Sequence, residues 1–212
     1  MGIDKGYYDF DDDFDVLLLE NGLIDEMFYM RDLQQRKLFL VDGVSQDTVI
    51  DIVKHILQIN KEDKGIEPEN RRPILLYVSS PGGEVDAGYE LIDAIIASKT
   101  PVYTINLGYQ YSMGFLIGLA GHKRFATPNS KFLIHDGSSF TYGSTNKVLD
   151  QVKFQEKVED RTRKYILSRS NLSAEEYDKN LRVEWYLFAD EAKEKGLTDY
   201  IIGVDCDVDM II

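Results

Sequence analysis

A serine, a histidine and a pair of glycines stand at the ends of predicted strands. Ser112 follows a predicted strand at 102–107 and begins an apolar helix at 113–120, and His135 ends the apolar run 132–134. In α/β folds, functional side chains gather at the carboxyl edge of the sheet. A serine and a histidine at that edge suit nucleophilic catalysis, in which the imidazole takes the hydroxyl proton. Gly82-Gly83, after a strand at 74–78, can aim backbone amides at a ligand and form an oxyanion hole.

Each of these residues also has an ordinary interpretation. Serine is common as a simple cap at the start of a helix, and a Pro-Gly pair usually marks a tight turn. The residues before Ser112 miss the G-x-S-x-G pattern of α/β-hydrolases, because Gln110 stands where the first glycine should be. The other two histidines, His55 and His122, are expected at the surface. Local sequence alone therefore leaves both possibilities open.

Composition excludes several functional classes. The formal net charge of −13 and the lack of a Lys/Arg cluster argue against nucleic-acid binding. The most apolar run, at 113–120, is far shorter than the roughly 20 residues needed to span a bilayer, and no secretory signal begins the chain. A single cysteine, Cys206, indicates a reducing compartment, so we expect a cytoplasmic protein without a membrane partner. No metal-binding motif is present, and we expect no metal and no cofactor.

The elements that must position these residues alternate between strands and helices. Strands are predicted at 37–41, 74–78, 102–107, 125–127, 131–134 and 200–202, and helices after Ser45 (with Val49, Ile52, Val53, Ile56 and Leu57 facing the core), at 87–95, 113–120, 147–168 and 190–195. Between the first helix and the second strand, residues 60–72 read as a loop. Such alternation predicts a parallel sheet with right-handed crossovers. The charged, glycine-free stretch 147–168 predicts a long helix projecting from one domain that spans residues 1–212.

A set of short motifs, taken in order, resembles the ClpP-like serine peptidases. They are Ser80-Pro81-Gly82-Gly83, Tyr111-Ser112-Met113-Gly114, residues 123–130, Ile134-His135, residues 188–192 and residues 196–199, and together they cover about 37–202. The resemblance implies a ClpP/crotonase-like α/β fold, with parallel sheets, flanking helices and a protruding helical handle at about 143–181. The acidic N-terminal segment 1–22 diverges from the family's axial loops.

The resemblance also implies an activity and an assembly. Ser112 would be the nucleophile and His135 the general base of a serine endopeptidase, and the amides of Gly83 and Met113 would hold the oxyanion. Members of the family stack two seven-membered rings into a tetradecamer that encloses the active sites. They degrade unfolded polypeptides or peptides, which an AAA+ unfoldase normally supplies.

Departures from the family's pattern leave alternatives open. Glu184 stands where the family has the aspartate that orients the histidine, and Asp136 is a less favoured alternative partner for His135. Gln110 and Tyr111 replace small residues before the nucleophile and are expected to reshape the substrate pocket or cover the serine. Asp136-Gly137 replaces a Gln-Pro pair, so substrate alignment is expected to differ. The main alternative is a catalytically weakened structural or regulatory ring subunit; acyl-CoA chemistry on the same fold is a lesser one.

Overall fold

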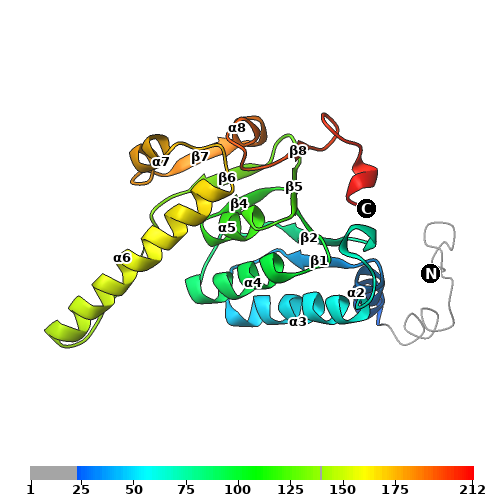
Figure 1. Ribbon diagram of the computed structural model, residues 1–212, viewed down its shortest axis with the longest axis horizontal. Helices are drawn as coiled ribbons and strands as arrows, with labels where there is room; N and C mark the ends of the chain where they lie inside the picture. Colours follow the sequence, from blue (N-terminus) through cyan, green and yellow to red (C-terminus); the bar gives the residue numbers. More distant parts are fainter. Residues whose placement is uncertain (1–22, 139) are drawn as a thin grey trace. The chain divides into compact units, whose positions relative to one another are not determined.

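The computed structural model describes residues 23–138 and 140–212 (Figure 1). The predicted acidic segment 1–22 lies outside this part of the chain. Two compact units are present, one ending at Leu38 and the other spanning Phe39–Ile212. One domain over residues 1–212 therefore stays a prediction. In the first unit, helix α2 (Ile24–Gln34), which the sequence did not predict, has acidic residues in its first turn and Arg31 in its last. Negative charges near the N-terminus and a positive charge near the C-terminus of a helix interact favourably with its dipole.

The central sheet contains five strands in the order β1-β2-β3-β5-β8. Their bounds are Lys37–Leu40, Ile74–Val78, Val102–Asn106, Lys123–Ala126 and Tyr200–Ile201. The pairs β2/β3, β3/β5 and β5/β8 are parallel. Every residue of β2 is buried, as expected for a parallel strand covered on both faces. The structure thus confirms the predicted α/β fold with a mostly parallel sheet.

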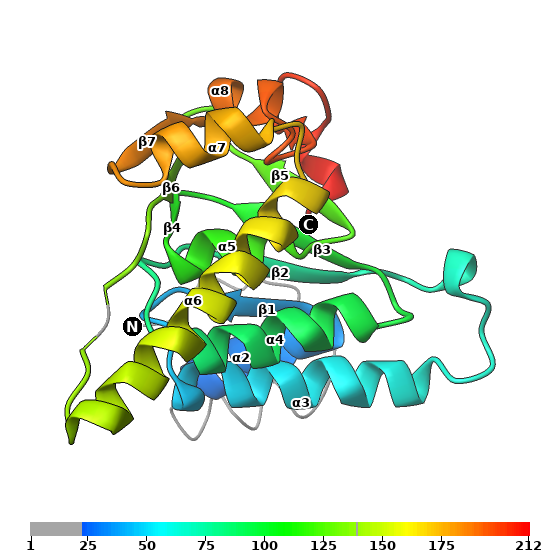
Figure 2. The same ribbon diagram turned by 60° about the vertical axis from the view of Figure 1, so that its left-hand side comes forward.

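Two helices lie side by side along one face of this sheet (Figures 1 and 2). Helix α3 (Gln46–Glu62) begins at the predicted cap, where the Ser45 hydroxyl accepts a hydrogen bond from the Thr48 amide. Helix α4 (Val85–Ala97) packs against α3. Leu57 was predicted in the core but is 61% exposed, because Ile59 completes the buried stripe of α3 instead. The predicted loop at 60–72 starts later, since α3 continues to Glu62; it includes the short 3₁₀ helix η1 (Pro68–Asn70).

The opposite face of the sheet is covered by the C-terminal segment. Leu75 and Tyr77 of β2 form a buried cluster with Ile105, Phe125, Ile202 and Ile211. Ile211 follows the 3₁₀ turn η2 (Val208–Met210), and its carbonyl accepts a hydrogen bond from the Tyr77 hydroxyl. Residues two apart on a strand share one face, which explains why Leu75 and Tyr77 meet this segment while their neighbours face the helices.

A smaller, three-stranded sheet carries the predicted site. Its order is β4-β6-β7, with bounds Tyr109–Tyr111, Lys131–Ile134 and Trp185–Phe188. Helix α5 (Met113–Leu119) follows β4, and α8 (Ala189–Glu194) follows β7. The sequence predicted β6, α5 and α8 but neither β4 nor β7, which are three and four residues long. Segments this short show little periodicity, so their strand pairing is decided by tertiary contacts.

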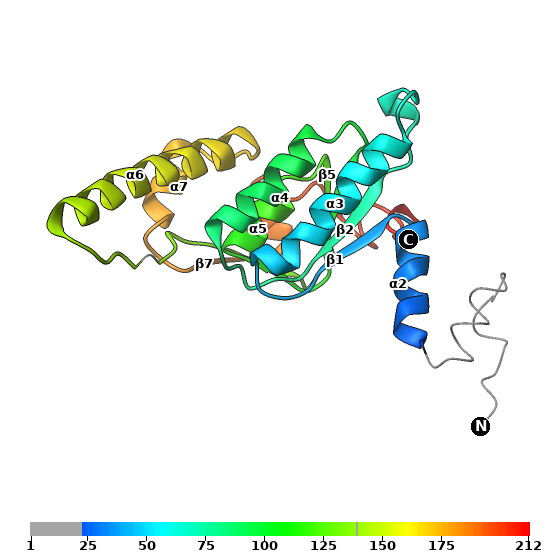
Figure 3. The ribbon, with the colours of Figure 1, turned by 90° about the horizontal axis from the view of Figure 1, so that it is seen from below.

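The predicted handle contains two helices. Helix α6 (Thr145–Ser168) has 24 residues, about 36 Å at 1.5 Å per residue, and extends away from the sheets of its unit (Figure 3). Within this fully described helix, Ile166 is the buried residue. Helix α7 (Ala174–Asn180) then leads back toward β7. The long, sparsely apolar helix predicted at 147–168 is therefore confirmed.

Candidate active site

Ser112 occupies a strained turn between β4 and α5. Its φ of 52° and ψ of −121° lie outside the regions that residues other than glycine normally adopt. Although Ser112 is the N-cap residue of α5, its side chain makes no capping hydrogen bond. The structure therefore does not support the interpretation of Ser112 as a simple helix cap. A serine on a strained strand-to-helix turn, with its hydroxyl not used for capping, has the geometry of a nucleophile elbow.

Strand register explains why distant residues meet. Strands β4 and β6 are parallel, with Tyr111 opposite Leu133, and the Ser112 amide donates a 3.1 Å hydrogen bond to the Leu133 carbonyl. Strands β6 and β7 are antiparallel, with Ile134 opposite Trp185. One step further along this ladder, His135 is opposite Glu184, where cross-strand side chains are neighbours. The carboxyl ends of β4 and β6 thus meet the amino end of β7.

His135 and Glu184 are in direct contact. The His135 Nδ1 atom is 3.0 Å from the Glu184 Oε1 atom. The His135 side chain is 23% exposed, whereas that of Glu184 is 58% exposed. The His135 Nε2 atom is buried and has no hydrogen-bond partner among the described residues. A neutral imidazole that donates from Nδ1 to a carboxylate keeps an acceptor lone pair on Nε2, as a general base requires.

Ser112 and His135 line one cavity of about 140 Å³, together with Gly83 and Met113. The wall is mostly apolar and includes Val85, Phe115, Leu133 and Ile134, while α6 contributes residues such as Val158 and Glu159. The Ser112 hydroxyl is not hydrogen-bonded to His135 Nε2. Catalytic hydrogen bonds are often long before substrate binds, so this geometry is compatible with proton transfer in a complex.

Two backbone amides are placed beside the serine. Val44 bonds to the carbonyl of Gly82 and to the amide of Glu84, so the amide of Gly83 takes no part in this bridge and the residue faces the cavity. Met113 is the first residue of α5, and the first amides of a helix have no intrahelical acceptor. Gly83 and Met113 line the same cavity as Ser112, as the prediction of an oxyanion hole requires.

Comparison with known proteins agrees with this geometry. The Clp protease family model matches residues 21–205. The chain belongs to the Clp protease family. One relative, the ATP-dependent Clp protease proteolytic subunit 2 of Treponema pallidum (strain Nichols), is 32% identical over 186 residues. The aligned residues cover 87% of this chain and 90% of the relative.

In this Clp protease chain, the side chains of the two residues before the nucleophile pack outside the cavity that Ser112 lines. Gln110 is 3% exposed and packs against α5, where a Cβ atom added at Gly118 would be 2.1 Å from its Oε1 atom. The Tyr111 ring packs edge-on against Tyr186, with 5.7 Å between the ring centroids, and lines a separate surface depression. Neither residue lines the cavity of Ser112. The structure thus places neither side chain in this cavity, and a change in substrate alignment by Gln110 and Tyr111 stays a prediction.

The other predicted candidates have different outcomes. Asp136 lines the cavity and is exposed, but the carboxylate that contacts His135 belongs to Glu184. His122 is exposed, as predicted, and its Nδ1 atom accepts a 3.0 Å hydrogen bond from the Val102 amide. His55 is half-buried on α3. Sequence reasoning missed Val158 and Glu159 of α6, because a sparsely apolar helix gives no signal for the cavity it will line.

Within residues 23–138 and 140–212, no helix is both long and apolar enough to cross a membrane. The same residues contain no group of three or more histidine, cysteine, aspartate or glutamate side chains arranged to hold a metal ion.

Proposed function

We propose that this chain is a serine endopeptidase, with Ser112 as nucleophile, His135 as general base and Glu184 as the group that orients His135. One observation carries the proposal. His135 Nδ1 lies 3.0 Å from Glu184 Oε1, while Nε2 is buried and has no hydrogen-bond partner within residues 23–138 and 140–212, and His135 lines the same cavity as Ser112. An imidazole held by a carboxylate on one nitrogen and open on the other is prepared to accept a hydroxyl proton.

The reaction follows from these positions. As Ser112 Oγ bonds to the scissile carbonyl carbon, its proton passes to His135 Nε2, and the oxyanion accepts hydrogen bonds from the Gly83 and Met113 amides. The imidazolium then protonates the leaving nitrogen while the C–N bond breaks, which leaves an acyl-enzyme. Water repeats the sequence: its proton passes to Nε2, its oxygen bonds to the acyl carbon, and the ester bond breaks as Ser112 regains a proton.

A catalytically weakened subunit is the alternative proposal. It is favoured by the 58% exposure of the Glu184 side chain, because water competes for an exposed carboxylate and screens its charge. The missing hydrogen bond between Ser112 and His135 favours it too. A subunit of this kind would keep the fold and its contacts with other subunits while hydrolysing peptides slowly.

We further propose that the chain assembles into two heptameric rings, a tetradecamer, that degrades unfolded polypeptides in the cytoplasm. Support comes from exposed apolar side chains on α6, namely Leu149, Val152 and Phe154, which a neighbouring subunit could cover. The relative's name describes a proteolytic subunit of an ATP-dependent protease, which supports an AAA+ unfoldase as partner. The single cysteine, Cys206, supports a reducing compartment.

The test combines labelling with a measurement of assembly. The purified full chain is treated with a fluorophosphonate, and the added mass is read by intact mass spectrometry beside the Ser112→Ala variant. Native mass spectrometry reports the number of subunits in the same sample. We expect labelling that disappears in Ser112→Ala, together with turnover of an unstructured peptide. An assembled ring that takes up no probe and cleaves no peptide would favour the weakened subunit instead.

A further inference from the structure

Helix α5 is too short to hold itself in place. It contains seven residues, so few of its backbone groups have partners within the helix. At and just beyond its C-terminal end, side chains from outside the helix donate to the carbonyls of Leu116, Leu119, Ala120 and Gly121. The Gly118 carbonyl accepts a bond from the Gly121 amide at 3.4 Å and a second one from the Thr104 hydroxyl at 2.6 Å. Because buried carbonyls are nearly always hydrogen-bonded, the donors to these groups decide where the helix lies.

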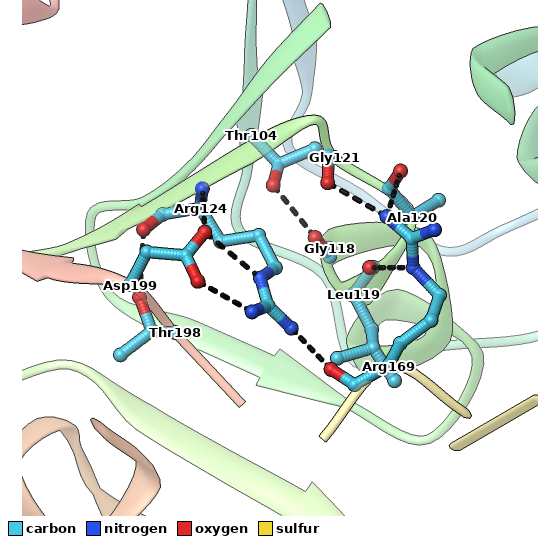
Figure 4. A network of polar contacts seen from close by, with 9 residues as sticks. All are labelled: Thr104, Gly118, Leu119, Ala120, Gly121, Arg124, Arg169, Thr198 and Asp199. Carbon is cyan, nitrogen blue, oxygen red and sulfur yellow. Dashed lines mark hydrogen bonds and ion pairs between the residues drawn. The ribbon is translucent and has the colours of Figure 1, made fainter. Parts of the chain in front are cut away.

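One arginine supplies three of these bonds (Figure 4). The Arg169 Nε atom donates to the Leu119 carbonyl at 2.7 Å. One terminal nitrogen of the same guanidinium donates to the carbonyls of Ala120 and Gly121, at 2.9 and 2.8 Å. A guanidinium offers donors in a rigid fork, and its positive charge suits the negative end of a helix dipole. Arg169 therefore restrains the direction of α5 as well as its position.

Arg169 is itself anchored on both sides. It is the C-cap residue of α6, and its own carbonyl accepts a 2.7 Å hydrogen bond from Arg124. Arg124 is held in turn by the Asp199 carboxylate, 3.0 Å from its Nε atom (Figure 4). One turn earlier on α6, the Tyr165 hydroxyl donates to the Leu116 carbonyl at 3.0 Å. Burial raises the pKa of Tyr165, so its hydroxyl stays a donor at every working pH.

The other end of α5 is closely packed against backbone. A Cβ atom added at Gly114 would lie 2.8 Å from the Ser80 carbonyl oxygen, and one added at Gly82 would lie 2.8 Å from Ser112 Cβ. The helix thus behaves as a short rod of about 10 Å, with Ser112 at one end and Arg169 at the other. A tilt of about 6° would move Ser112 by about 1 Å, and an error of that size in an active site can cost about 100-fold in rate.

We propose that Arg169 is a positioning residue for the reaction. By holding three carbonyls at the end of α5, it sets the angle of the helix and so places the Ser112 hydroxyl and the Met113 amide relative to His135. This inference rests on the proposed role of Ser112 as nucleophile. It adds that the base of the handle, through a side chain that does not touch the cavity, determines how fast the serine reacts.

The test compares arginine variants on the same helix. Arg169→Met keeps an unbranched apolar stem but lacks the guanidinium and so removes all three bonds, whereas Arg169→Lys keeps the charge without the fork. Arg163→Met is the matched control, because Arg163 is paired with Asp178 of α7 and its loss leaves the α5 carbonyls bonded. Each variant is measured for melting temperature, assembly, fluorophosphonate labelling rate, and kcat and KM on an unstructured peptide.

We expect Arg169→Met to lower kcat and the labelling rate about 10- to 100-fold, as a displacement of up to about 1 Å implies, with KM little changed. Arg169→Lys should fall between this variant and wild type, and Arg163→Met should label at the wild-type rate. Millimolar guanidinium, far below the molar range in which it unfolds proteins, should restore part of the rate of Arg169→Met. Amide hydrogen exchange should rise in residues 112–121 of that variant.

Opposite results are equally clear. If Arg169→Met labels as fast as Arg163→Met, the inference is overturned while the proposed function stands. It is also overturned if the loss follows melting temperature alone and guanidinium does not restore it, since the role of Arg169 would then be general stability. Tyr165→Phe, which removes one bond to α5, keeps the comparison possible if Arg169→Met does not fold. A wild-type chain that takes up no probe would contradict the proposed function itself, and the bonds from Arg169 to α5 would then have no role in catalysis.

Discussion

Replacing Glu184 by glutamine should slow the labelling of Ser112 by about 10- to 70-fold. The amide keeps the size of the side chain but removes the charge that faces His135 Nδ1 at 3.0 Å. A hydrogen bond to a charged group contributes about 1.5–3 kcal/mol, and the exposure of Glu184 favours the lower part of that range, about 1.5–2.5 kcal/mol. Since about 1.4 kcal/mol corresponds to a tenfold change in rate, this gives the stated factor.

The assay is the second-order rate of fluorophosphonate labelling, read by intact mass. Glu175→Gln is the control, because it removes the same charge from an exposed position on α7. Glu184→Asp adds a second comparison: shortening the side chain by one C–C bond of about 1.5 Å would open the 3.0 Å contact to about 4.5 Å, beyond hydrogen-bonding distance. We therefore expect Glu184→Asp to label nearly as slowly as Glu184→Gln.

Labelling of Glu184→Gln within threefold of both wild type and Glu175→Gln would refute this reasoning, because Glu184 would then not orient His135. A loss of about 10⁴, the cost of the wrong imidazole tautomer in a buried triad, would refute the estimate from the other side. It would mean that the carboxylate is shielded from water in the working enzyme, for example by a neighbouring subunit.

Three further predictions concern the scaffold. Gly82→Ala should lower the free energy of unfolding by at least about 1 kcal/mol and abolish labelling, because φ is +96° and the added Cβ would meet Ser112 Cβ at 2.8 Å; normal labelling in this variant would contradict that packing. Although part of His122 is exposed, the packing around its ring removes enough water to lower its pKa, and the charge of Arg169 lowers it further. The unfolded chain therefore binds the proton more readily, and stability should fall as pH drops below about 6.5; His122→Gln should flatten this slope in thermal unfolding, and an unchanged slope would contradict it. Ser45→Ala should cost about 1 kcal/mol in urea unfolding through loss of the α3 cap, and a change below about 0.3 kcal/mol would mean that water replaces the cap.

Much of the fold follows from local patterns in the sequence. Strand β2 matches its predicted bounds, since five consecutive apolar residues between polar segments indicate a buried strand. Helix α3 begins at its predicted cap because a serine hydroxyl there satisfies a free helix amide. Ser112 and His135 could be selected from the sequence for the same reason: a residue that ends a strand is exposed at the edge of the sheet.

Local patterns do not contain the partners of these residues. His135 meets Glu184 because β6 and β7 pair antiparallel in one register, and a shift of one residue would turn the two side chains to opposite faces. Gln110 packs against α5 and Tyr111 against Tyr186, on opposite sides of β4, a strand of three residues that pairs with β6; neither contact is visible in the local sequence.

The sequence by itself determined the kinds of element, the family motifs and the two side chains most able to react, since these depend on neighbouring residues. The family motifs already favoured Glu184 over Asp136 as the partner of His135, and the tertiary structure brought its carboxylate to Nδ1; the tertiary structure alone decided which groups hold α5. Arg169 bonds to carbonyls 48 to 50 positions away in the chain. Backbone carbonyls are the same in every residue, so no sequence pattern marks the ones that an arginine will find, and only the packing of α6 against α5 brings them together.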